Sequence, residues 1–87
     1  MASNYKPSGP VTLSEEQVVS LYQKLRDMRH DVNGRLANIA AAAELIRVRP
    51  ASTEERLKIL LEQPHQALEA IELFAKEFET MLGLARR

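Results

Sequence analysis

Apolar residues recur along most of the chain at every third or fourth position, the repeat of a helix that buries one face. The first series precedes Pro50 and comprises Val18, Leu21, Leu25, Met28, Val32, Leu36, Ile39, Ala43 and Ile46. A strict heptad would use Arg35 instead of Leu36, so two successive four-residue steps predict a local stutter. We expect one helix over residues 14–49, roughly 50 Å long at 1.5 Å per residue.

A second series follows the short connection Pro50-Ala51. It comprises Leu57, Leu60 or Leu61, Leu68, Ile71, Phe74 or Ala75, Phe78, and Met81 or Leu82. Gly83 is a suitable C-cap for the helix that this series predicts. Pro64 lies inside the series, so we expect the helix to bend or divide near Gln63.

Two capping boxes are predicted at the starts of these helices. Ser14 with Gln17 has the required spacing for the first helix, and Ser52 with Glu55 has it for the second. Both pairs place a hydroxyl where it can accept from a backbone N–H of the first turn.

The predicted fold class is all-α, a long antiparallel helical hairpin. Residues 1–12, with Pro7, Gly9 and Pro10, are expected to form a flexible lead, and residues 13–87 the one domain. Ordering about 70 residues costs on the order of 100 kcal/mol, which about 4,000 Å² of buried apolar surface would offset. Two helices touching along one seam bury less, so we expect a homodimer forming a four-helix bundle.

Composition narrows the function classes. Twelve basic and twelve acidic residues cancel, so neither nucleic acid nor an anionic membrane is an expected partner. Cysteine is absent, which excludes thiol chemistry, and no metal or other cofactor is expected. No stretch reaches the roughly 20 apolar residues of a membrane span, and the N-terminus lacks a signal-peptide core. A cytoplasmic location is therefore expected.

His30 is the main candidate for chemistry. At about 100° per residue it lies about 160° from Val32, on the solvent face of the predicted helix. Gly34, Ala37 and Ala41 continue that face with almost no side chain, where a solvated helix usually carries charges. The strip would let the backbone of another protein approach the imidazole. The alternatives are an incidental surface histidine and alanines chosen as helix formers.

Asp31 is next to His30 in sequence but about 100° around the helix. A carboxylate there could accept the proton of one ring nitrogen and leave the other as a nucleophile toward phosphorus. The alternative is an ordinary surface charge. Arg35, one turn ahead, is the expected ion-pair partner of Asp31.

The run His30-Asp31-Val32-Asn33, followed by Leu36 and Ile39, resembles the H-box of histidine-kinase dimerisation and phosphoacceptor domains. The resemblance covers about residues 14–82 and includes the proline-containing turn. It implies bacterial two-component signalling: a histidine phosphorylated from ATP by a separate catalytic domain, then transfer to an aspartate of a response-regulator receiver domain. It makes His30 the phosphoacceptor and Asp31 the activating acid.

Two positions depart from that family. Gly34 stands where many members have the Thr or Asn of phosphatase activity, which puts that activity in doubt, and Arg35 replaces a helix-bending proline.

The stretch also resembles histidine-phosphotransfer domains, because a glycine follows the histidine by four residues and a small residue, Asn38 and Ile39 come after it. Asn33 takes the place of that family's lysine, and the helices are too few for such a monomer.

The chain has no Gly-rich box or Asn-rich magnesium segment, so it cannot be a kinase on its own. We expect either a stand-alone phosphocarrier that a separate histidine kinase loads, or the phosphoacceptor piece of a longer protein or pair. The residues expected to contact its partners are Asn33, Gly34, Ala37, Asn38 and Ala41. The alternative function is a helical dimerisation or adaptor module without phosphoryl chemistry.

Overall fold

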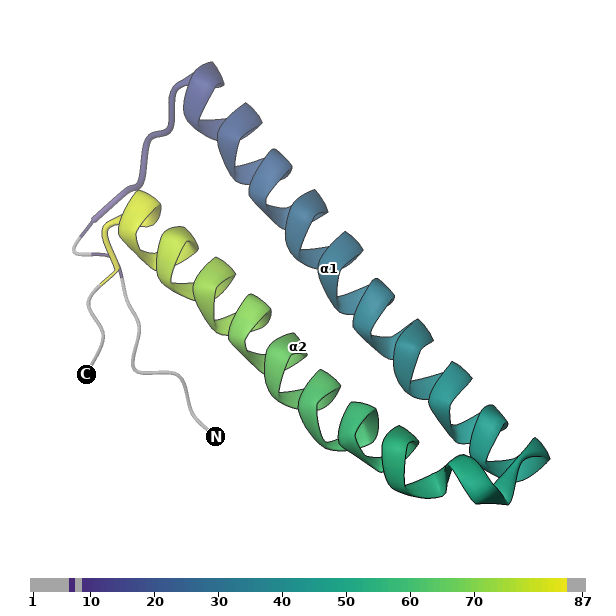
Figure 1. Cartoon of the computed structure of the whole chain (residues 1–87). Helices are drawn as coiled ribbons and strands as arrows, with labels where there is room; N and C mark the ends of the chain where they lie inside the picture. The colour runs from purple at the N-terminus through teal and green to yellow at the C-terminus, as the bar shows by residue number, and fades with distance from the viewer. Residues whose placement is uncertain (1–6, 8, 85–87) are drawn as a thin grey trace.

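The computed structural model describes residues 7 and 9–84, and it is a hairpin of two long helices (Figure 1). Helix α1 spans Glu15–Val48 and α2 spans Thr53–Leu82, with the single 3₁₀ turn η1 (Pro50–Ser52) between them. The described residues include no strand, so the expected all-α hairpin is confirmed. Most of the expected N-terminal lead, residues 1–6 and 8, lies outside the described residues.

The N-terminal capping box of α1 is confirmed. Ser14 Oγ accepts from the backbone N–H of Gln17 at 3.1 Å, and Gln17 Oε1 accepts from the backbone N–H of Ser14 at 2.8 Å. Gly83 ends α2 in the left-handed conformation (φ 66°, ψ 30°), where the backbone N–H of Leu84 reaches the Glu79 carbonyl at 2.8 Å. These caps place the helix ends where the sequence predicts them.

The expected capping box at Ser52 is wrong. Ser52 makes no side-chain cap, and its hydroxyl donates to the Arg49 carbonyl at 2.8 Å. The chain enters α2 through η1, which gives Ser52 nearly helical dihedral angles instead of the extended conformation of a capping residue. A division of α2 at Pro64 is also wrong, because α2 continues unbroken to Leu82.

The interhelical seam keeps a strict heptad, so the expected stutter is wrong. Ala42 is 2% exposed, whereas the predicted seam residue Leu36 is 54% exposed. Arg35 occupies the seam position that Leu36 was expected to take. The α1 side of the seam comprises Leu21, Leu25, Met28, Val32, Arg35, Ile39, Ala42 and Ile46. A long arginine stem can pack along apolar surface, which lets a charged residue hold this place.

The hairpin has little core of its own. Among the described residues only Ala42 and Ala67 are buried. The principal extents are 57 × 28 × 14 Å, so the molecule is one helix thick in its smallest direction. In the part of the chain that the structure describes, neither helix is apolar over the length that crossing a membrane requires.

Candidate functional site

His30 lies near the middle of α1, exposed and on the side facing away from α2. It shares a shallow surface depression with Arg26, Asp27, Arg29 and Asn33. Helical spacing explains the grouping, because residues four before and three after His30 lie on the same face. The predicted exposure of His30 is confirmed, and its neighbours in the depression are two arginines, the Asp27 carboxylate and the Asn33 amide.

The surface following His30 toward the hairpin turn is flat. Gly34, Ala37 and Ala41 are all exposed. A Cβ built on Gly34 would meet nothing within 4 Å, so the glycine is not required by packing inside the chain. A flat, unobstructed helix face beside an imidazole is suited to a partner that must bring its own reacting atom close.

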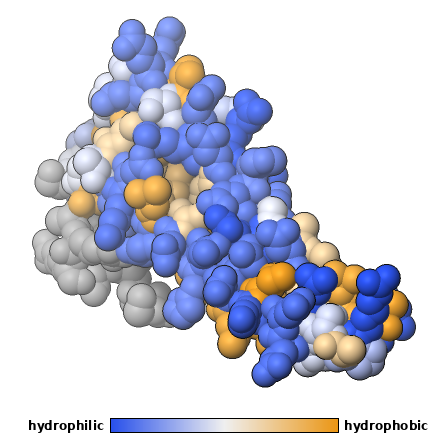
Figure 2. Space-filling model, in the orientation of Figure 1, coloured by the Kyte–Doolittle hydropathy of each residue, from blue (hydrophilic) through white to orange (hydrophobic). Residues whose placement is uncertain are grey.

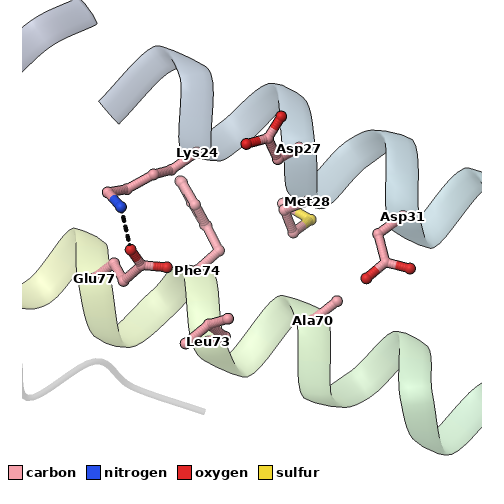
Figure 3. A pocket seen from close by; sticks show the side chains of 8 residues that line it. All are labelled: Lys24, Asp27, Met28, Asp31, Ala70, Leu73, Phe74 and Glu77. Atoms are coloured by element: carbon pink, nitrogen blue, oxygen red, sulfur yellow. Dashed lines mark ion pairs between the residues drawn. The ribbon is translucent and has the colours of Figure 1, made fainter. Parts of the chain in front are cut away.

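Asp31 lies on a different side of α1 from His30. Its Oδ1 accepts from Arg35 Nε at 3.0 Å, which confirms the expected ion pair. Figure 3 shows Asp31 beside a crevice between the two helices, with Ala70 of α2 across from it. The structure therefore brings Asn33 to His30 but directs Asp31 toward α2.

Arg35 is the centre of a polar layer across the seam. Its Nη1 donates to Gln66 Oε1 at 2.5 Å and to Gln63 Oε1 at 3.5 Å. Asn38 Nδ2 also donates to Gln63 Oε1, at 3.1 Å. Asn38, predicted to face a partner, is thus engaged with α2 although it remains exposed. This layer connects the Asp31 carboxylate to the second helix through Arg35.

The crevice of Figure 3 is the polar side of the hairpin. An ion pair between Lys24 and Glu77 bridges the helices there, and Asp27 and Asp31 line the same crevice. Ion pairs at this exposure contribute modestly to stability. No group of residues in the described part of the chain could hold a metal ion.

Sequence reasoning missed two parts of this arrangement. The charge balance counts Arg26 and Arg29 only within the total of basic residues, although their spacing from His30 places them beside it. Gln63 and Gln66 were missed as partners of Arg35, because the stutter had moved Arg35 out of the seam.

Comparison of the chain with protein-family models, with curated proteins and with solved structures finds no match in any of the three.

Proposed function

We propose that this protein is a phosphorelay carrier whose His30 accepts a phosphoryl group and passes it to an aspartate of a receiver domain. The observation that carries the proposal is the exposed imidazole in a depression with Arg26, Arg29 and Asn33, beside the flat strip of Gly34, Ala37 and Ala41. Arginine N–H groups and the Asn33 amide are suited to hydrogen-bond phosphoryl oxygens. The strip leaves room for the receiver.

In the loading step a neutral ring nitrogen of His30 attacks the terminal phosphorus of ATP held by a separate kinase. The N–P bond forms as the bond from phosphorus to the ADP oxygen breaks, and ADP leaves with the electron pair. The proton of the other ring nitrogen goes to solvent or to a carboxylate. In the second step a receiver carboxylate oxygen attacks phosphorus, and the P–N electron pair returns to the imidazole.

Asp31 is proposed as the acid that assists His30, in agreement with the H-box resemblance. Its carboxylate can accept several hydrogen bonds, so the Arg35 contact at 3.0 Å still leaves acceptor capacity for an imidazole proton. Because Arg35 holds Asp31 toward α2, proton transfer to Asp31 needs a side-chain rotation. Arg35 is therefore a positioning residue for Asp31.

The carrier is proposed to work as a homodimer, with two hairpins forming a four-helix bundle. The support is the thinness of the single hairpin, whose described part buries only Ala42 and Ala67. The alternative function, a dimerisation or adaptor module without phosphoryl chemistry, would use the same assembly without His30.

Phosphoramidate, a small phosphodonor that needs no kinase, tests the proposal. Wild-type protein is expected to gain an acid-labile, base-stable phosphate on His30, because Arg26, Arg29 and Asn33 beside the exposed imidazole can bind the phosphoryl oxygens of the donor. His30→Gln is expected to abolish it, whereas the control His65→Gln, which replaces an exposed histidine of α2, is expected to retain it. Phosphate-affinity electrophoresis and ³¹P NMR measure the product.

Transfer is tested by mixing the loaded protein with a panel of purified receiver domains and Mg²⁺. Loss of phosphate from His30 with its appearance on a receiver aspartate is the expected result. No phosphate on wild-type protein, or equal phosphate on His30→Gln, contradicts the proposal and favours the adaptor alternative.

A further inference from the structure

Helix α2 has a second line of apolar residues that α1 does not cover. Each residue of this line comes one position after a residue of α2 that packs in the seam, as Ala75 comes after Phe74. The steps between them alternate between four and three residues, and the line comprises Leu57, Leu61, Pro64, Leu68, Ile71, Ala75, Phe78 and Leu82. Leu61 is 72% exposed and Leu68 63% exposed, and no position in the line is charged. Two heptad lines offset by one residue point about 100° apart, the pattern of a helix that packs against two neighbours in a bundle.

The two sides of the hairpin differ in character. In an antiparallel pair, residues that follow the seam by one position lie on the same side of both helices. On α1 that side carries Tyr22, Leu36, Ala40 and Ala43 together with the polar residues Arg26, Arg29, Asn33 and Arg47, all exposed. The opposite side is the crevice with Lys24 and Asp31 in Figure 3. Figure 2 shows hydrophobic residues gathered at the surface where the helices join. We call the first side apolar for its uncharged α2 half, and the opposite side, which has charges from both helices, polar.

We propose that a second copy of this chain covers the apolar side, with the second line of α2 as the centre of the interface. This inference rests on the homodimer of the proposed function and identifies its contact face. From Leu57 to Leu82 the line runs about 38 Å at 1.5 Å per residue. Two neighbouring helices, each about 10 Å across, are together about 20 Å wide, so the face measures roughly 750 Å², close to the 800 Å² per partner of a stable interface.

The partner proposed for this face is another molecule of the same chain. Monomeric proteins seldom expose an apolar patch of several hundred Å², and a face about 38 Å long matches a second hairpin of the same length. Phe78 of the second line lies with its ring centroid 5.9 Å from that of the seam residue Phe74. The two lines are thus joined by aromatic packing into one apolar region.

This interface leaves the candidate site accessible. His30 lies about 100° beyond Arg29 around α1, away from the seam. Arg26, Arg29 and Asn33 each follow a seam residue by one position, so they lie on the side of α1 that faces the second copy. Long arginine stems can pack there while their guanidinium groups stay in water beside His30. Gly34, Ala37 and Ala41 follow His30 along the outer edge. Each hairpin of the dimer would present its own strip to a receiver.

The full chain tests the proposal, with charge placed on either side of α2. Wild-type protein is expected to have twice the 9.8 kDa chain mass in sedimentation equilibrium. Leu68→Lys is expected to lose the dimer, either as a folded monomer or with loss of helical circular dichroism. The matched control is Leu73→Lys, because Leu73 is 61% exposed on the polar side of the same helix. It is expected to keep both the dimer and the helicity.

Single cysteines test the same face without adding charge, since the chain has none. The thiol of Leu68→Cys is expected to be alkylated about tenfold more slowly than that of Leu73→Cys, because only dissociated chains expose it. A wild-type monomer, a Leu68→Lys dimer or equal alkylation rates would each overturn the interface.

The phosphoramidate assay tests a different claim. A phosphorylated monomer refutes only the interface, and an unphosphorylated dimer refutes only the phosphoacceptor role.

Discussion

His30 and Asp31 are sequence neighbours whose side chains have different surroundings. His30 shares an open depression with two arginines, and Asp31 pairs with Arg35 toward the second helix. The 100° between successive helical residues produces this separation. A carrier needs the imidazole exposed to two partners in turn, and the helix phase provides that exposure while Asp31 takes part in the polar layer.

Gly34 is the residue whose presence the fold does not explain. A glycine inside a helix costs about 1 kcal/mol relative to alanine, and an added Cβ would meet nothing within 4 Å. We expect Gly34→Ala to raise the unfolding midpoint by about 4–8 °C for a domain of this size. Thermal circular dichroism measures the shift.

Gly83→Ala is the matched control for that substitution. Gly83 has φ 66°, a conformation that costs other residues about 1–2 kcal/mol, so its midpoint is expected to fall. A lower midpoint for Gly34→Ala would contradict the view that Gly34 is kept for access to the strip and not for packing.

At the scale of the helices, the seam combines apolar packing with one polar layer. A polar residue in a heptad seam specifies register at some expense of stability. We expect Arg35→Leu to raise the unfolding midpoint by about 4–8 °C, corresponding to about 1 kcal/mol, because leucine would continue the apolar seam. Thermal unfolding measures the gain, and sedimentation is expected to detect assemblies other than one dimer.

Lys58→Leu is the control for Arg35→Leu, because Lys58 is exposed on α2 outside both the seam and the second apolar line. Its midpoint is expected to change little. If the unfolding midpoint of Arg35→Leu is lower than that of wild type, the polar layer stabilises the hairpin and does not set its register at the expense of stability.

The starts of the two helices should respond differently to the loss of a serine. Ser14→Ala removes the hydroxyl that accepts from Gln17 and is expected to destabilise by about 1 kcal/mol. Ser52→Ala removes a bond to the Arg49 carbonyl and no cap, so its effect is expected to stay within about 0.5 kcal/mol. Urea unfolding of both variants measures the difference, and equal losses would contradict the assignment of the caps.

The helices, their ends and the exposure of His30 could be predicted because local chemistry determines them. Apolar spacing, the Ser14 box and Gly83 act within a few residues of where they stand. The register at Arg35 could not be predicted from one helix, because it depends on acceptors that α2 supplies. The grouping of Arg26 and Arg29 with His30 was available from helix phase alone.

In the whole molecule, we assign separate roles to three surfaces: the apolar side, the polar side, and the outer edge of α1 that carries His30. The apolar side pairs with a second copy, the polar side fixes the alignment of α1 and α2, and the edge beyond Arg29 presents His30. The dimer interface and the phosphoryl site would then adjoin along Arg26, Arg29 and Asn33, with His30 and the flat strip beyond them. A receiver could bind without opening the bundle, because its docking strip lies outside the proposed interface.

The most direct test of the central claim is mass-spectrometric localisation of the phosphate on wild-type protein treated with phosphoramidate. Fragmentation that preserves the N–P bond is expected to place the phosphoryl group on His30, with His65 modified much less. The arginines and Asn33 near His30 are the reason for this selectivity. Phosphate spread equally over His30 and His65, or found on neither, would contradict the account.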